Sequence, residues 1–131
     1  MAAVRVLLDT HAMLWWLFDD PKLSSAARSV IVSPGNEIVV SAASAWEIAT
    51  KHRLGRLPEA GDVAVRLPHY LRRARFAVLA ISLEHAQAAG ALPGPHKDPF
   101  DRMLVAQARI EDLAVATIDG VFRDYGVAVI W

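Results

Sequence analysis

The stretch VRVLLDTH, residues 4–11, decides the fold of this chain. It starts as a short apolar and β-branched run that predicts a strand over residues 4–8, and the run stops abruptly at Asp9. A helical pattern follows at once and is closed by Pro21. An apolar strand that leads directly into an amphipathic helix is typical of a parallel sheet covered by helices.

The same alternation continues along the rest of the chain. We expect further strands over residues 38–40, 76–81, 114–118 and 127–131. We expect further helices over residues 24–32, 44–54, 62–75, 82–91 and 98–110. This order predicts an α/β fold in which a mostly parallel β-sheet is sandwiched by α-helices. No repeat, linker or break in composition interrupts the chain, so residues 1–131 are expected to form a single domain.

The composition limits the possible functions. The chain has 131 residues, 54% hydrophobic and 21% charged, which is the balance of a globular protein and not of a disordered one. Fourteen basic residues balance fourteen acidic ones, so any affinity for nucleic acid has to be local. The absence of cysteine excludes disulfides, thiolate nucleophiles and cysteine-based zinc sites. The apolar runs are too short to span a membrane and the N-terminus lacks a leader pattern, so we expect no membrane contact and a cytoplasmic location.

Acidic residues fall where the predicted strands end or the next helices begin, and these are Asp9, Glu47, Asp98, Asp101 and Asp119. Ligands of open α/β sheets lie beyond the carboxyl ends of the strands, so several of these carboxylates should converge there. Converging like charges resist ionisation unless a cation joins them, and oxygen ligands favour Mg²⁺ or Mn²⁺. Such an ion activates water for attack on a phosphodiester.

Three of these acids also have a structural explanation near the start of a helix or in a turn. Asp98 is suited to cap a helix that has Pro99 at its first position, and Asp101 can complete a capping box with it. Asp119 is followed by Gly120, and Asp-Gly is a strong turn dipeptide. A capping or turn role accounts for these three acids without an acidic site, but it does not exclude one.

Glu47 has two structural explanations and Asp9 has none. Glu47 fits a capping box with Ser44, and it can also pair with Lys51 one helical turn later. Asp9 interrupts an apolar run at a strand end with no cap or basic partner adjacent in sequence. All the structural explanations have to hold together for the site to vanish, so we favour a metal site.

Other classes of enzyme lack their signatures. The chain has no GxxxxGK[ST] loop, no GxGxxG fingerprint and no GxSxG elbow. His11 stands where a haloacid-dehalogenase-like phosphatase needs its second aspartate, and the acidic pair and late lysine of a response-regulator receiver are missing. The histidines show no HExxH spacing, which argues against zinc. His11 and His96 flank the acidic residues and either touch substrate or serve as ordinary hydrogen-bonding groups.

Four motifs carry a resemblance to a known family: LLDTH at 7–11, SAASAWEI at 41–48, KDPFDR at 97–102 and TID at 117–119. In their order and spacing they resemble PIN-domain ribonucleases, specifically the VapC-type toxins of bacterial type II toxin–antitoxin pairs. The resemblance implies a parallel sheet with helices on both faces. It implies a catalytic, metal-binding quartet of Asp9, Glu47, Asp101 and Asp119. It also implies that the residues orienting this quartet are Thr10, Ser44, Asp98 and Thr117.

The resemblance further implies cleavage of single-stranded or loop RNA with Mg²⁺ or Mn²⁺, a homodimer, and silencing by a cognate antitoxin protein. Water activated by a metal ion needs no side-chain nucleophile. The RNA has to be held by its backbone, and the basic candidates near the acids are Lys51, Arg53, Lys97 and Arg102. Two other functions stay open: a protein-binding module whose acidic edge docks an arginine-bearing partner, and a structure-specific DNA nuclease.

Overall fold

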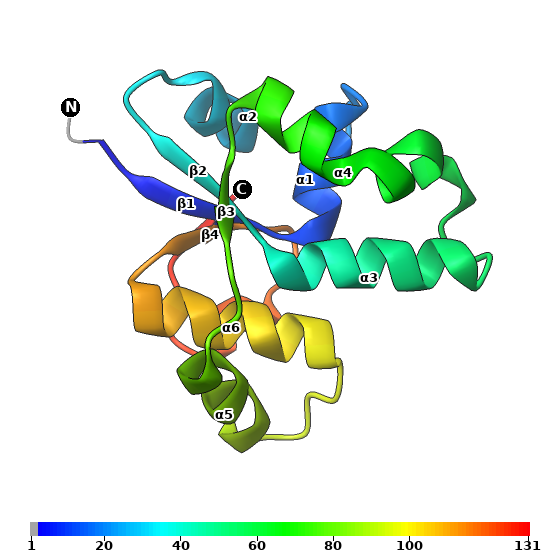
Figure 1. Cartoon of the computed structure of the whole chain (residues 1–131). Coiled ribbons are helices and arrows are strands. Elements are labelled where there is room, and N and C mark those ends of the chain that lie inside the picture. Colours follow the sequence, from blue (N-terminus) through cyan, green and yellow to red (C-terminus); the bar gives the residue numbers. More distant parts are fainter. Residues whose placement is uncertain (1–2) are drawn as a thin grey trace.

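Strands and helices alternate in the computed structural model, which describes residues 3–131 (Figure 1). The strands are β1 (Arg5–Leu8), β2 (Glu37–Ser41), β3 (Ala77–Leu79), β4 (Ala114–Ala116) and β5 (Val129–Ile130). The helices are α1 (Thr10–Leu17), α2 (Ser25–Val32), α3 (Ala42–Arg53), α4 (Gly61–Ala74), α5 (Leu83–Ala91), α6 (Pro99–Glu111) and α7 (Val121–Asp124), with a 3-10 turn η1 (Pro58–Ala60). Met1 and Ala2, which belong to the N-terminal pattern and the single-domain span expected above, lie outside the described residues.

The strands form one sheet in the order β3-β2-β1-β4-β5, and every neighbouring pair is parallel. Leu7, at the centre of β1, is in register with Val39 of β2 and Val115 of β4. The chain therefore winds outward from β1 in one direction and then, from β4, in the other. The point where the order reverses lies between β1 and β4, which is where open α/β sheets bind their ligands.

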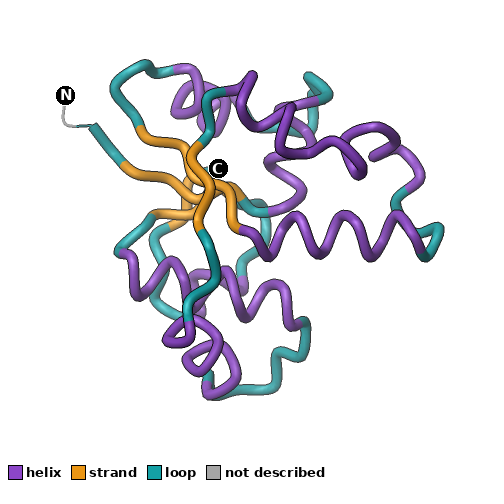
Figure 2. Tube along the Cα trace, viewed as in Figure 1, coloured by secondary structure: helices purple, strands orange, loops and turns teal. Residues whose placement is uncertain are grey.

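Helices cover both faces of this sheet (Figures 1 and 2). Successive side chains of β1 point to opposite faces, so Val6 and Leu8 pack in a cluster with α1, α2 and α4. Leu7 packs in the second cluster, with α6 and α7. All three side chains are fully buried, which explains the continuous apolar run of this strand. The predicted α/β sandwich with a parallel sheet is confirmed.

Several element boundaries differ from the prediction. Helix α3 begins at Ala42 and is capped by Ser41, so the expectation that Ser44 opens this helix is wrong. Strand β3 is shorter than the predicted 76–81, because it lies at the edge of the sheet and pairs only with β2. The last strand is likewise reduced to Val129–Ile130 at the opposite edge. Among residues 3–131 we find no helix with the length and hydropathy needed to cross a membrane.

Candidate active site

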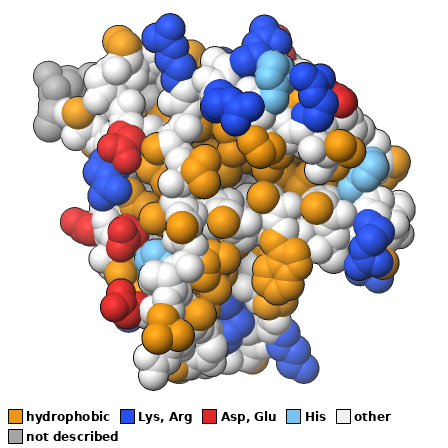
Figure 3. All heavy atoms as spheres, in the orientation of Figure 1, with side chains coloured by type: hydrophobic (Ala, Val, Ile, Leu, Met, Phe, Trp, Pro, Cys, Tyr) orange, Lys and Arg blue, Asp and Glu red, His pale blue; other side chains and the backbone are white. Residues whose placement is uncertain are grey.

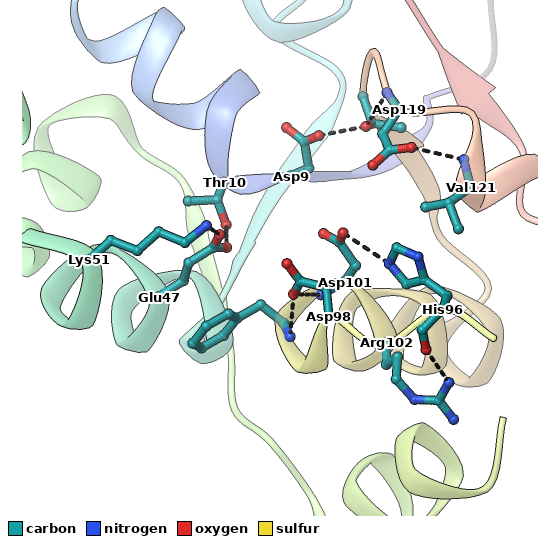
Figure 4. A network of polar contacts seen from close by, with 12 residues as sticks. Asp9, Thr10, Glu47, Lys51, His96, Asp98, Asp101, Arg102, Asp119 and Val121 are labelled. Atoms are coloured by element: carbon teal, nitrogen blue, oxygen red, sulfur yellow. Dashed lines mark hydrogen bonds and ion pairs between the residues drawn. The ribbon is translucent and has the colours of Figure 1, made fainter. Parts of the chain in front are cut away.

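The acidic residues singled out in the sequence surround one region at the carboxyl edge of the sheet (Figure 4). Asp9 follows β1 directly, and Asp119 lies in the turn between β4 and α7. Glu47 lies on α3, and Asp98 and Asp101 lie at the start of α6. Because β1 and β4 flank the point where the strand order reverses, these carboxylates stand at the expected ligand position of the fold.

Asp9 is held in a fixed orientation by donors on both of its oxygens. As the N-cap of α1, it accepts a hydrogen bond from the Ala12 backbone N–H to Oδ1 at 2.7 Å. Its Oδ2 accepts from the Thr117 hydroxyl at 2.5 Å. The side chain is buried, and this burial raises the pKa of Asp9, while the Thr117 hydrogen bond opposes the shift. Asp9 is thus a buried, oriented carboxylate, and its capping role is one that the sequence did not indicate.

The turn after β4 connects Asp9 to Asp119. The Asp119 backbone N–H donates to Thr117 Oγ1 at 3.0 Å, so the same hydroxyl that binds Asp9 also shapes this turn. Asp119 Oδ1 in turn accepts from the Val121 backbone N–H at 3.0 Å. Asp119 therefore does stabilise a turn, as the structural explanation expected, and it also lies at the acidic site.

Both carboxylate oxygens of Glu47 also have partners in the protein. The Thr10 hydroxyl lies 2.6 Å from Glu47 Oε1 and 3.0 Å from Ser44 Oγ. A hydroxyl has one proton, so Thr10 donates to the carboxylate and accepts from Ser44. Glu47 Oε2 forms an ion pair with Lys51, as the alternative explanation from the sequence expected. Ser44 therefore acts through Thr10 on the Glu47 carboxylate and not as a helix cap.

The start of α6 brings two acids close together. Asp98 Oδ1 accepts from the backbone N–H groups of Phe100 and Asp101 at 2.9 and 3.1 Å, which confirms its N-cap role. Asp101 Oδ2 lies 3.1 Å from Nε2 of His96. Burial, followed by repulsion from Asp98, raises the pKa of Asp101 to about 6, and the hydrogen bond to His96 opposes the shift. Weaker repulsion from Asp119 and Glu47 adds to it.

The chemistry of these donors fits a hard divalent cation. They are carboxylate oxygens, they repel one another through a partly buried region, and Mg²⁺ and Mn²⁺ prefer such ligands. Within residues 3–131 no three acidic or histidine side chains converge tightly enough to hold an ion as they stand. Each acid is instead turned toward a donor of the protein: Thr117, Val121, His96 or Lys51. Rotation of these carboxylates toward a common centre is what a bound ion would require.

Two of the four basic candidates are already engaged. The Arg102 guanidinium donates to the backbone carbonyls of Ala89, Gly90, Leu92 and His96 at 3.0, 3.3, 2.5 and 2.8 Å. It therefore fastens the loop before α6 to the end of α5, and this geometry argues against the predicted RNA contact. Lys51 is paired with Glu47. Arg53 and Lys97 are exposed.

One polar contributor was not identified from the sequence. Gln107 is fully buried on α6, and its Oε1 accepts from the Ser41 hydroxyl at 2.5 Å. This bond ties α6 to the residue that caps α3, and so links the helix of Asp101 to the helix of Glu47. The sequence signal was a glutamine at a core-facing position within an apolar stretch. His96 was identified from the sequence as a residue flanking the acids, and its partner in the structure is Asp101.

The PIN domain family model matches residues 6–128. Ribonuclease VapC22 of Mycobacterium tuberculosis (strain ATCC 25618 / H37Rv) is 31% identical over 121 residues, covering 92% of this chain and 91% of that protein. The chain therefore belongs to the PIN-domain family. Ribonuclease VapC16 of the same organism is 40% identical over 73 residues, which cover 53% of this chain and about half (50%) of that relative's length.

Solved structures agree with this assignment at the level of the fold. VapBC2 from Rickettsia felis, bound to a DNA fragment from its promoter, has a TM-score of 0.70 at 15% identity, covering 96% of this chain and 97% of that one. A toxin–antitoxin complex from Klebsiella pneumoniae has a TM-score of 0.60 at 18% identity, covering 88% and 87%. Nearly the whole chain is therefore superimposable on known PIN-like folds.

Proposed function

We propose that this chain is a VapC-type toxin, a Mg²⁺- or Mn²⁺-dependent endoribonuclease that hydrolyses phosphodiester bonds in single-stranded or loop RNA. The observation that supports this most is the set of carboxylates of Asp9, Glu47, Asp101 and Asp119 around the reversal point of the sheet. The two relatives named as ribonucleases support RNA as the substrate class.

In this proposal Asp9, Glu47, Asp101 and Asp119 hold the ion. A bound Mg²⁺ would polarise a phosphoryl oxygen and lower the pKa of a bound water, so that hydroxide is available to attack phosphorus. The chain's own task is orientation: Thr117 fixes Asp9, Thr10 fixes Glu47 and His96 fixes Asp101.

The basic residues complete the proposal for RNA binding. Arg53 follows Glu47 along α3, and Lys97 directly precedes the start of α6, so both exposed cations are available to phosphates of a bound strand. The neutral overall charge is then an average over an acidic centre and basic residues next to it.

We further propose a cognate antitoxin and a homodimer as partners of this single domain. A toxin–antitoxin complex among the fold neighbours supports the first. For the second, Figure 3 shows hydrophobic side chains gathered across the middle of one face. Large exposed apolar residues include Trp46, Val78 and Leu83, with 60%, 63% and 86% of their surface accessible. Light scattering of the purified chain measures the homodimer directly, and a monomer at all concentrations contradicts it.

The test of the activity compares single-stranded RNA with DNA of the same sequence in Mn²⁺. We expect the RNA to be cleaved, leaving 5′-phosphate ends, and cleavage to stop in excess EDTA or with Asp119→Asn. The matched control is Glu59→Gln, which removes a charge from the exposed turn η1 and should cleave like the wild type. Full cleavage in EDTA contradicts the metal mechanism, and a clear preference for DNA contradicts the toxin assignment.

A further inference from the structure

A cavity of about 600 Å³ opens next to the acidic site, and the mechanism above assigns no ligand to it. One wall is formed by residues 93–96 of the loop before α6. The other is formed by Val121, Asp124 and Tyr125, in and directly after α7. Apart from the carboxylate of Asp124 and the imidazole of His96, the lining side chains are apolar or aromatic.

Two lining residues are in direct contact with the acids. His96 Nε2 lies 3.1 Å from Asp101 Oδ2, and the Val121 backbone N–H donates to Asp119 Oδ1 at 3.0 Å. Each of the two walls of the cavity therefore contains a residue that also contacts an acid of the site. A polymer such as RNA that has one phosphate at the acids can therefore place the adjacent nucleotide in this cavity.

The loop wall is held in place at three points. Arg102 binds the carbonyls of Leu92 and His96, on either side of the Pro-Gly-Pro turn. The Tyr125 hydroxyl donates to the Pro93 carbonyl at 2.7 Å. Gly94 has φ +93°, and a Cβ there would lie 3.3 Å from the tyrosine oxygen, so a glycine is needed for this close approach. The cavity is thus formed before any ligand arrives.

The lining residues suit a flat, largely apolar ring with hydrogen-bond donors on its edge. The rings of Pro93, Pro95 and Tyr125 offer surfaces for stacking, as in proteins that bind the splayed bases of single-stranded RNA. The Asp124 carboxylate only accepts hydrogen bonds and repels phosphate. Guanine alone among the four bases offers two adjacent N–H donors, at N1 and N2, to a single carboxylate.

We propose that this cavity is a nucleobase subsite that takes the base of the nucleotide next to the scissile phosphate, and that Asp124 makes it prefer guanine. The inference rests on the proposed RNA cleavage, but binding of a base can be measured without cleavage. Tyr125 supplies stacking for any base, and Asp124 supplies the discrimination among bases.

The binding test titrates the ¹⁵N-labelled full chain in EDTA with the trinucleotides UGU, UAU, UCU and UUU. We expect UGU to bind most tightly and to shift the amide signals of Gly94, His96 and Tyr125. Tyr125→Ala should weaken all four trinucleotides by about tenfold, the loss expected for one base–aromatic stack. Asp124→Asn should reduce the affinity for UGU to that for the other three.

Two controls separate the ring from its tether and from general charge effects. Tyr125→Phe removes the hydrogen bond to Pro93 but keeps the ring, so it should bind all four trinucleotides much better than Tyr125→Ala. Glu59→Gln removes a remote surface charge and should bind like the wild type. Signal shifts confined to residues outside the cavity, or unchanged affinities in both Tyr125→Ala and Asp124→Asn, overturn the subsite.

Cleavage assays in Mn²⁺ then separate the two proposals. One outcome is that the wild type cleaves RNA while both cavity variants have the wild-type kcat/KM on every sequence. In that case the subsite is wrong and the nuclease assignment stands. If the wild type binds UGU in the cavity but cleaves no RNA, the nuclease assignment fails and base binding stands. With both correct, Tyr125→Ala lowers kcat/KM about tenfold and Asp124→Asn removes the preference for guanine.

Discussion

The two ends of the parallel sheet treat charged residues in opposite ways. At the amino end, Arg5 of β1 and Glu37 of β2 form an ion pair at 3.6 Å, and their side chains are 50% and 51% exposed. At the carboxyl end, Asp9 is only 8% exposed and Asp101 has a pKa raised to about 6. Charge at the amino end is balanced and solvated, whereas at the carboxyl end five acidic side chains, two of them buried, outnumber their paired lysine, Lys51.

The starts of two helices stabilise some, but not all, of the carboxylates at the carboxyl end of the sheet. Asp9 and Asp98 cap the starts of α1 and α6, where the unpaired N–H groups and the positive end of the helix dipole stabilise anions. These caps account for two carboxylates and leave Asp101 and Asp119 in excess. The excess of acidic side chains at the carboxyl end is the contrast with the amino end on which the proposed cation site rests.

Replacing Asp9 by asparagine gives the strongest test of this contrast. The amide keeps an oxygen for the Ala12 N–H, so the helix cap survives while the negative charge is lost. We expect kcat/KM for RNA to fall by more than about 100-fold, since loss of a mere supporting residue of a metal site already costs about 10–100-fold. Glu37→Gln at the amino end is the matched control. Equal cleavage by both variants in Mn²⁺ would show that the two ends do not differ in function.

Among the stability variants, removal of the Arg102 guanidinium should lower the free energy of unfolding most. Arg102→Met leaves four backbone carbonyls without their charged donor, so the free energy of unfolding should fall by about 2–3 kcal/mol in urea titrations. Arg102→Lys should recover only part of this, because an ammonium cannot reach as many acceptors as the planar guanidinium. An unchanged urea midpoint for Arg102→Met would show that the loop does not need this anchor.

Neutralising Asp101 should have the opposite sign in the metal-free chain. Its pKa of about 6 lies above the ordinary value of 3.8, so the folded state binds a proton more readily than the unfolded state. The contribution of this group to stability is therefore most favourable in acid and is lost as the pH rises through about 6. In EDTA at about pH 7, Asp101→Asn should be about 1–2 kcal/mol more stable than the wild type.

The pH dependence identifies the cause of that gain. The advantage of Asp101→Asn should shrink between about pH 6 and pH 4, where the wild-type carboxyl takes up its proton. Urea midpoints measured across this range in EDTA provide the test. A constant advantage at every pH would point to packing and not to charge.

Breaking the exposed ion pair at the amino end should have the smallest consequence. Arg5→Gln removes a half-exposed partner of Glu37, so the free energy of unfolding should change by no more than about 0.5 kcal/mol. Added salt should leave even less of this difference, because screening weakens exposed pairs. A loss as large as that of Arg102→Met would mean that the ends of the sheet are equally sensitive.

Local patterns in the chain were sufficient for the layout of the fold and for the position of the acids. The apolar run of residues 4–8 and its abrupt end at Asp9 predict a strand of a covered sheet with a carboxylate beyond it, and both features are present. Such patterns are reliable because burial and side-chain alternation along a strand depend on neighbours in sequence. The positions of Glu47 and Asp119 near the same sheet edge follow from parallel strands alone.

Tertiary contacts decided which donors each polar side chain meets. The local pattern favours Ser44 as the cap of α3, but Ser41 is the cap, and the two serines bind Gln107 and Thr10, which lie 66 and 34 residues away from them. Arg102 resembles an RNA-binding cation until the loop folds back and presents its carbonyls. The cavity beside the acids likewise requires Tyr125 to meet Pro93 across 32 residues. Hydrogen-bond partners this distant leave no periodic trace along the chain, because they are selected by the packing of completed elements.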